Sequence, residues 1–164
     1  MTEVIILAHN IRSTHNVGAI FRTAEGFGIS QIICSGYTPH PTTEADPRLP
    51  HISEKLTKQI HKTALGAETM VPFSYREQPP LAELSAQGYT IVGLEQAPNA
   101  TLLPHFTPSG KIALLIGEEV YGIEQSLINE CDTLIEIPMR GQKESFNVSV
   151  ATGIALYQIT CQNT

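Results

Sequence analysis

The chain has 164 residues, of which 41% are hydrophobic and 16% charged, and its formal net charge at pH 7 is −6. This composition is typical of a globular protein and excludes a disordered chain, and the length fits a single domain spanning residues 1–164. A net negative charge argues against a protein that holds nucleic acid by bulk electrostatics alone.

Neither the apolar runs nor the cysteines indicate a membrane or secreted protein. No stretch of about 18 apolar residues is present, so we expect no transmembrane helix and no membrane partner. Cys34, Cys131 and Cys161 are far apart and odd in number, which fits neither a disulfide framework nor a zinc site. We therefore expect a cytoplasmic protein.

The first predicted elements are a strand, a loop and a helix. Val4 to Ala8 form a nearly continuous apolar run, which predicts a strand buried on both faces. A polar loop follows, and Asn16 is placed to cap a helix with a clear apolar stripe. Arg22 lies far from the centre of that stripe, so it faces a cleft or solvent.

The middle of the chain alternates between strand and helix signals. After a loop rich in Pro, Thr and His, Ser53 is expected to cap a basic helix that runs to Lys62. The other predicted strands lie at 31–34, 68–73, 89–94 and 111–116, and the other helices at 79–87 and 123–129.

The last stretch predicts a strand, a polar loop and a helix. Leu134 to Ile137 form the strand, which Pro138 ends because proline donates no ladder hydrogen bond. Ser145 or Asn147 caps the final helix. Three small residues on that helix would let another backbone approach it closely: Ala151, Gly153 and Ala155.

Strands that alternate with helices predict an α/β fold with a mostly parallel sheet and helices on both faces. In such sheets ligands bind outside the carboxyl ends of the strands. The polar loops at 9–16, 94–99, 117–122 and 138–147 all follow predicted strands, so we expect the functional site there.

Several familiar catalytic motifs are missing from the sequence. It contains no GxGxxG, GxxxxGK[ST], HExxH, CxxC or GxSxG segment, so dinucleotide, P-loop, zinc and serine-hydrolase sites lack their motifs. The adjacent acids Glu118 and Glu119 suit acid–base chemistry, but they also suit one functional group beside a solvated neighbour, or the first turn of a helix.

Three separated segments together resemble the SpoU/TrmH family of SPOUT methyltransferases. HNIRSTHNVGAIFRTAEGFG (9–28) is similar to motif 1, with Asn16 and Arg22 at the family spacing. LLIGEEVYGI (114–123) is similar to motif 2 and IPMRGQKESFNVSVATGIALY (137–157) to motif 3. The resemblance covers essentially the whole chain in the correct order.

The resemblance also distinguishes between neighbouring residues. Motif 2, G-x-E-x-x-G, selects Glu119 over Glu118. The usual core of motif 3 is S-L-N-V-S-V-A, and this chain has Phe146 at the leucine position. We expect that position to touch the adenine of the cofactor, so the aromatic ring alters the pocket without abolishing it.

The resemblance implies a deep trefoil knot in the C-terminal half, an exception to the rule that chains do not thread. The knotted loops would bind S-adenosylmethionine in a bent shape, and the small-residue face of the last helix would lie in a homodimer interface. Arg22 and Asn16 of one subunit would then approach the cofactor of the other. The residues expected to bind the cofactor are Leu94, Gly117, Ile137, Met139, Ser145 and Phe146.

The implied reaction is methyl transfer from S-adenosylmethionine to a ribose 2′-hydroxyl of transfer or ribosomal RNA, without a metal. The implied catalytic residues are Arg22, Asn16, Glu119, Ser145 and Asn147. A guanidinium is essentially always protonated, so we expect Arg22 to orient the hydroxyl and stabilise the incipient alkoxide. The other four would position Arg22 and the hydroxyl.

Cations that could contact RNA phosphates are concentrated in the first third of the chain and in the motif 3 loop. They are Arg12, Arg48, Lys55, Lys58, Lys62, Arg140 and Lys143, of which we favour the last two.

Two alternative functions remain open at the level of sequence. The first is methylation of a base, as in more distant SPOUT enzymes, although these lack this arrangement of the motif 1 arginine. The second is a knotted RNA- or protein-binding module that no longer catalyses, which the net acidity and Phe146 favour and the intact polar motif residues oppose.

Overall fold

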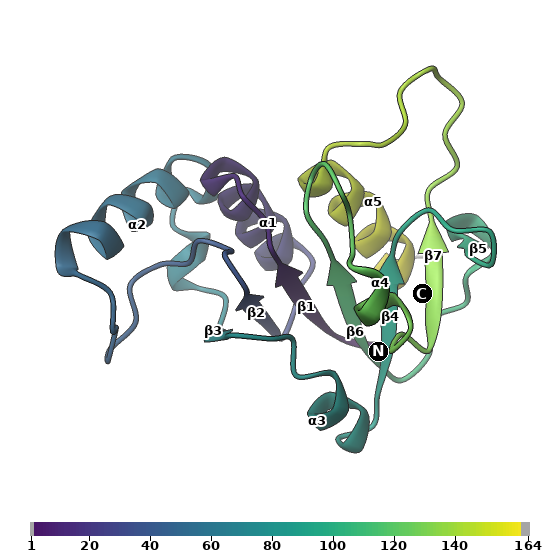
Figure 1. Cartoon of the computed structure of the whole chain (residues 1–164), viewed down its shortest axis with the longest axis horizontal. Helices are drawn as coiled ribbons and strands as arrows, with labels where there is room; N and C mark the ends of the chain where they lie inside the picture. The colour runs from purple at the N-terminus through teal and green to yellow at the C-terminus, as the bar shows by residue number, and fades with distance from the viewer. Residues whose placement is uncertain (1, 162–164) are drawn as a thin grey trace.

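A computed structural model describes residues 2–161, which form a seven-stranded sheet flanked by helices (Figure 1). The strands lie in the order β3-β2-β1-β6-β4-β7-β5, and all neighbours are parallel. They are β1 (Glu3–His9), β2 (Gln31–Ser35), β3 (Phe73–Arg76), β4 (Tyr89–Leu94), β5 (Thr101–Leu102), β6 (Lys111–Ile116) and β7 (Thr133–Glu136). The helices are α1 (Thr14–Gly26), α2 (Pro50–Ala64), α3 (Leu81–Ala86), α4 (Gln125–Ile128) and α5 (Val148–Cys161), with 3₁₀ turns η1 (Ala67–Thr69) and η2 (Leu103–His105).

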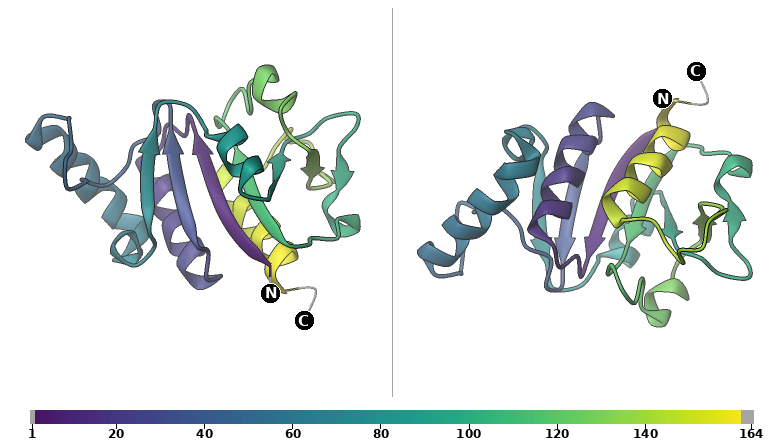
Figure 2. Two further views of the ribbon diagram at one scale, coloured as in Figure 1. Left: turned by 90° about the horizontal axis from the view of Figure 1, so that it is seen from below. Right: turned by 90° about the horizontal axis from the view of Figure 1, so that it is seen from above.

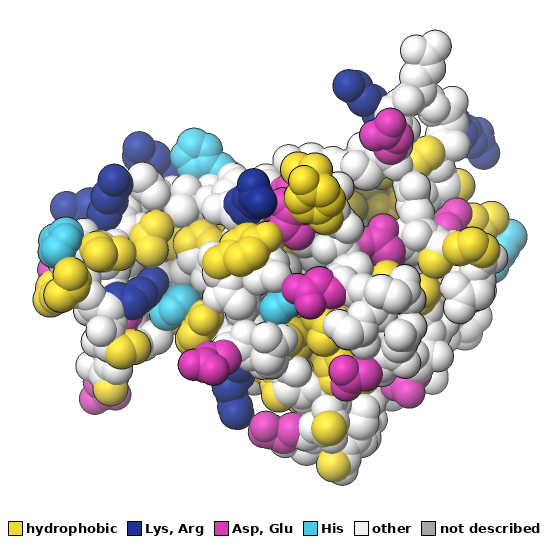
Figure 3. All heavy atoms as spheres, in the orientation of Figure 1, with side chains coloured by type: hydrophobic (Ala, Val, Ile, Leu, Met, Phe, Trp, Pro, Cys, Tyr) yellow, Lys and Arg dark blue, Asp and Glu magenta, His cyan; other side chains and the backbone are white. Residues whose placement is uncertain are grey.

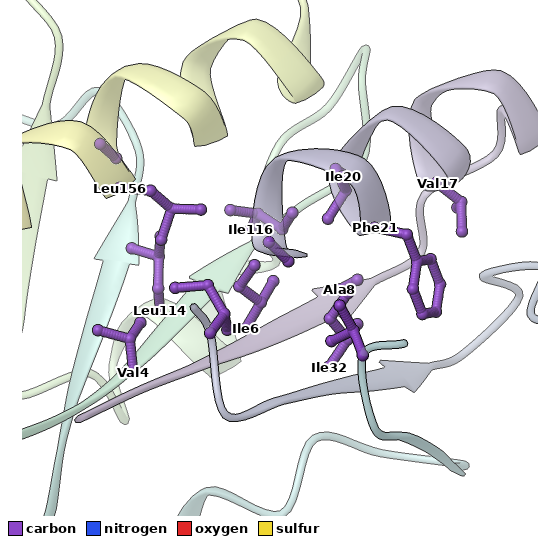
Figure 4. Packing of buried hydrophobic residues seen from close by; sticks show 14 of the residues in the cluster. Val4, Ile6, Ala8, Val17, Ile20, Phe21, Ile32, Leu114, Ile116 and Leu156 are labelled. Carbon is purple, nitrogen blue, oxygen red and sulfur yellow. The ribbon is translucent and has the colours of Figure 1, made fainter. Parts of the chain in front are cut away.

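Helices cover both faces of the sheet (Figure 2). On one face α1 and α5 lie side by side, with α2 packed against α1, whereas α3 and α4 cover the other face. Phe21 of α1 and Leu156 of α5 belong to the larger core, together with Ile6 and Leu114 from the two central strands (Figure 4). The predicted α/β class, with a parallel sheet and helices on both faces, is confirmed.

The parallel order brings four loops to one edge of the sheet, because parallel strands all end on the same side. The loops that follow β1, β4, β6 and β7 are the four in which the site was expected. The loop after β7, residues 137–147, stands well away from the sheet before α5 begins (Figure 1).

Three predicted boundaries were wrong. The cap of α1 is Ser13, whose hydroxyl accepts the Asn16 N–H at 3.1 Å, so Asn16 lies inside the first turn. Helix α2 begins at Pro50, since proline presets the helical φ of a first turn, and Ser53 is buried inside the helix. The strand predicted at 68–73 begins only at Phe73, as β3, because the carboxylate of Glu68 accepts the Gly66 N–H and residues 67–69 form the turn η1.

Helix α5 is capped by Asn147, one of the two predicted caps, whose Oδ1 accepts the Ser149 N–H at 2.9 Å. Two of the three small residues expected to face a second subunit contact other parts of this chain instead. Ala155 is fully buried within the chain, and Gly153 faces Thr23 of α1, so these small residues let α1 and α5 approach each other. Among residues 2–161, no helix is long and apolar enough to cross a bilayer.

Candidate active site

Three residues from the three motifs form one hydrogen-bonded chain at the carboxyl ends of the strands. The Nδ2 of Asn16, on α1, donates to Glu119 Oε1 at 3.1 Å. The Nδ2 of Asn147 donates to Asn16 Oδ1 at 3.1 Å, while Asn147 Oδ1 caps α5. The chain Glu119–Asn16–Asn147 therefore ties the loop after β6 to the first turn of α1 and to the start of α5.

Glu119 is also bound by the backbone of the motif 1 loop. Its carboxylate accepts the N–H groups of Arg12 at 3.1 Å and Ser13 at 3.2 Å. Partial burial by itself would raise the pKa of Glu119, but the hydrogen bonds from Arg12, Asn16 and Ser13 outweigh it and lower the pKa below its ordinary value. The group is therefore an ionised carboxylate at neutral pH, suited to holding donors in place.

The glycines of motif 2 are required by close backbone packing. A Cβ on Gly117 would lie 2.6 Å from the Gly122 carbonyl carbon and 2.6 Å from the Ile123 nitrogen. Gly122 has a φ of 71°, in the left-handed region that favours glycine. Glu118 is buried, and its carboxylate accepts the Val120 N–H at 2.9 Å inside the loop. Glu118 thus stabilises the loop from within, while Glu119 binds the backbone of the motif 1 loop and the side chain of Asn16.

The loops after β4, β6 and β7, together with the start of α5, enclose a cleft of about 260 Å³, which we name the acidic cleft. Five of the six residues predicted to bind the cofactor line it: Leu94, Gly117, Ile137, Ser145 and Phe146. The sixth, Met139, is half-buried outside this lining because the loop after β7 turns away from the sheet. Phe146 is 41% exposed, so its ring is available as an apolar wall.

The charge of the acidic cleft restricts what it can hold. Within the described residues its lining carries five glutamates (95, 118, 119, 136 and 144) and no lysine, arginine or histidine. Such a site repels phosphates and attracts cations. Leu94, Ile137 and Phe146 add apolar area for a flat ring system. A cationic ligand with an aromatic base, as S-adenosylmethionine is, fits both properties.

Arg22 and Ser145 lie apart from the hydrogen-bonded chain. Arg22 is exposed on α1, and its side chain makes no hydrogen bond or ion pair with any residue between 2 and 161. Ser145 is exposed at the mouth of the acidic cleft. Within a single subunit, therefore, the structure brings together Asn16, Glu119 and Asn147 but does not bring Arg22 to them.

Two of the expected phosphate contacts have other partners in the structure. Arg48 donates to Asp46 at 2.8 Å through Nε and to the carbonyls of His40 and Pro41, so within this chain its guanidinium holds the loop in which it lies. The Arg12 side chain is 63% exposed but pairs with Glu118 at 3.1 Å. Sequence patterns named Arg12 only as a possible phosphate contact and favoured Glu119 over Glu118. The ion pair between Arg12 and Glu118 lies between two motifs and is contained in neither of them.

No group of three or more His, Cys, Asp and Glu side chains arranged to hold a metal is found in the part of the chain that the structure describes.

The fold and this site define the class of the protein: a parallel α/β sheet whose carboxyl-end loops enclose an acidic ligand cleft. The model of the SpoU rRNA Methylase family matches residues 3–157, and the chain belongs to this family.

Named relatives and a solved structure match nearly the whole chain. It is 32% identical to the 23S rRNA (guanosine-2′-O-)-methyltransferase RlmB of Coxiella burnetii, over 97% of this chain and 58% of the relative. It is 29% identical to the tRNA (guanosine(18)-2′-O)-methyltransferase of Aquifex aeolicus, over 95% of this chain and 68% of the relative.

The crystal structure of an AdoMet-bound rRNA methyltransferase from Sinorhizobium meliloti has the same fold. The TM-score is 0.77 at 24% identity, over 96% of this chain and 55% of that one. The chain thus spans little more than half the length of several proteins that it matches.

Proposed function

We propose that this chain transfers a methyl group from S-adenosylmethionine to a ribose 2′-hydroxyl of transfer or ribosomal RNA. The observation that carries the proposal is the Glu119–Asn16–Asn147 chain at the edge of the acidic cleft. Support comes from family membership and from relatives named for 2′-O-methylation of both RNA types.

The acidic cleft would hold the cofactor through its charge and its apolar walls. Its glutamates balance a positive charge, and Leu94, Ile137 and Phe146 flank an adenine ring. When bound, S-adenosylmethionine supplies an electrophilic methyl group on a sulfonium, which is a good leaving group. Burial between the loops would exclude water from the reacting atoms.

The protein residues would then align and polarise the RNA hydroxyl. Glu119, Asn16 and Asn147 fix the edge of the cleft against which the ribose rests. Arg22 donates hydrogen bonds to the 2′-oxygen and stabilises its negative charge as the hydroxyl proton passes to solvent. Ser145, at the mouth of the cleft, supports the ribose. Since Arg22 lies apart from Asn16 within one chain, this step calls for a second subunit.

We propose a homodimer formed through the exposed apolar stripe of α5, residues Val150, Ile154 and Tyr157, which are 50%, 37% and 54% exposed. The i, i+4, i+7 spacing places the three side chains on one face of the helix. Because α5 lies beside α1, which carries Arg22, docking there would bring Arg22 of one subunit towards the cleft of its partner (Figure 2).

The remaining expectations complete the proposal. We propose that residues 1–164 form one domain of the family, with a deep trefoil knot in its C-terminal half. We further propose that the protein acts in the cytoplasm. The strands of residues 2–161 all belong to one sheet, which supports a single domain.

The test is incubation with methyl-labelled S-adenosylmethionine and unmodified transfer or ribosomal RNA, followed by digestion to nucleosides and mass spectrometry. We expect a 2′-O-methylnucleoside with the wild type and none with Arg22→Ala, which should still bind the cofactor. Arg22→Lys keeps the positive charge but loses the planar guanidinium. Comparing it with Arg22→Ala therefore separates the contribution of the charge from that of the guanidinium N–H donors. A methylated base would contradict the proposed acceptor, and RNA binding without cofactor binding would indicate a non-catalytic module.

A further inference from the structure

A second hollow, which we name the aromatic groove, opens beside the motif 1 loop and differs from the acidic cleft in charge. The lining residues that matter here are Arg12, Tyr37, His40, Arg48, Phe73 and Tyr75. Among the described residues its lining contains no aspartate or glutamate. The two hollows meet at Arg12, whose backbone N–H binds Glu119 of the acidic cleft.

The tyrosines of this groove are exposed, and hydrogen bonds fix the ring of Tyr75 and the backbone of Tyr37. Tyr37 is 53% exposed and Tyr75 is 39% exposed. The Tyr37 N–H donates to Asn10 Oδ1 at 3.1 Å, and the Tyr75 hydroxyl donates to the Gly36 carbonyl at 2.7 Å. Large exposed tyrosines on a fixed backbone are typical of a binding surface, because a tyrosine loses little conformational entropy when a partner covers it.

The groove is also fixed relative to the proposed catalytic network. The Thr38 hydroxyl donates to the Ala8 carbonyl at 2.8 Å and accepts the Ile11 N–H at 3.0 Å. The loop that carries Tyr37 is therefore tied to the loop whose next residues bind Glu119. A ligand lying on Tyr37 is thus held in register with the acidic cleft.

Tyr75 is connected to the core by stacked rings. It stacks on His40, with ring centroids 4.8 Å apart and planes at 24°, and Phe73 meets the buried Phe21 edge-on at 5.6 Å. On the other side of the groove, the Arg12 guanidinium lies 5.9 Å from the centre of the Tyr37 ring. The groove thus offers a flat ring surface beside an exposed cation.

We propose that the aromatic groove binds an unpaired nucleotide of the substrate RNA adjacent to the methylated ribose. Its base would stack on Tyr37, and its phosphate would meet Arg12. This inference rests on the proposed function. It explains how an acidic chain holds RNA, since the RNA occupies a hollow whose lining carries Arg12 and Arg48 and no carboxylate, apart from the acidic cleft that holds the cofactor. Lys and Arg side chains gathered over α2 extend the same electropositive face (Figure 3).

The experiment measures fluorescence anisotropy of a short, labelled single-stranded RNA bound by the full chain. Stacking on an aromatic side chain contributes a substantial part of the affinity for a single strand, so Tyr37→Ala should weaken binding about tenfold. Tyr37→Phe keeps the ring and should restore it. Met70→Ala, at a 67% exposed residue outside both hollows, is the matched control. Cofactor affinity, measured by calorimetry, should be the same in all variants.

The outcomes separate this inference from the proposed function. If Tyr37→Ala binds the RNA as tightly as the wild type, or if the wild type does not bind it, the aromatic groove is not a nucleotide site. If the wild type binds RNA through Tyr37 but transfers no methyl group, the groove stands and the proposed function fails.

Discussion

Glu119 is the residue on which the geometry of the site converges. Its carboxylate accepts two backbone N–H groups and the Asn16 amide, from a segment more than one hundred residues earlier in the chain. Hydrogen bonds to an ionised acceptor are stronger than neutral ones. One side chain therefore fixes the relative position of motifs 1 and 2, and through Asn16 that of motif 3 as well.

Replacing this carboxylate should impair catalysis more than cofactor binding. In Glu119→Gln the ionised acceptor is lost, and each charged hydrogen bond contributes about 1.5–3 kcal/mol. We expect kcat for methyl transfer to fall by about one to two orders of magnitude. Glu130→Gln, at an exposed acid outside the acidic cleft, is the matched control. An unchanged kcat in Glu119→Gln would contradict a role for this network.

The same carboxylate makes the motif 1–motif 2 contact sensitive to acid. The folded state lowers the pKa of Glu119 from its ordinary value of 4.5, so the stabilisation is complete above that value. It is lost as the pH falls through the lower pKa of the folded state. Wild-type stability should therefore decline more steeply below about pH 4.5 than that of Glu119→Gln. Unfolding midpoints across pH test this, and parallel curves would contradict it.

The elements themselves were largely predictable. The buried runs of β1, β4 and β6 and the apolar stripe of α1 follow from residue patterns that act locally. The residue at which α1 begins could not be predicted from the sequence, because both Ser13 and Asn16 are residue types that cap helices. The turn before it is fixed by Thr38, which is bonded to Ala8 and Ile11, and no local pattern contains that contact.

The site was predictable in its residues and loops but not in its connections. Motif spacing pointed to Asn16, Glu119 and Asn147, which the fold brings together. The position of Met139 outside the cleft lining and the ion pair of Arg48 with Asp46 were not predicted, because the direction of an exposed loop and the partner of a surface cation depend on three-dimensional context. Aromatic and charged residues after β2 carried no motif, so the aromatic groove could not be predicted.

The loop after β6 should not tolerate a side chain at Gly117. An alanine Cβ would meet backbone atoms of Gly122 and Ile123 at 2.6 Å, and backbone cannot move aside as a flexible side chain can. We expect Gly117→Ala to destabilise the fold by about 1–3 kcal/mol and to abolish cofactor binding. Gly141→Ala, whose Cβ would meet nothing within 4 Å, is the control. If calorimetry gave Gly117→Ala the same stability and cofactor affinity as the wild type, the tight packing of this loop would be contradicted.

At the level of the whole molecule, the proposed dimer depends on an apolar stripe that one chain leaves exposed. A charge placed at Ile154, between Val150 and Tyr157, would have to be desolvated on association. We expect Ile154→Asp to be monomeric by analytical ultracentrifugation and inactive in methyl transfer, while its fold is retained. Met70→Asp, at an exposed apolar residue elsewhere, should leave the assembly unchanged. If Ile154→Asp were still a dimer, the proposed interface on α5 would be contradicted, and the dimer would have to form through another face.

The acidic cleft determines whether the chain is an enzyme of the proposed kind, and isothermal titration with S-adenosylmethionine addresses it directly. We predict saturable binding of one cofactor per chain, reduced in Phe146→Ala, which removes the aromatic wall of the cleft. If titrations at two temperatures showed no binding heat at millimolar cofactor, the proposed cofactor and with it the methyl transfer would be contradicted.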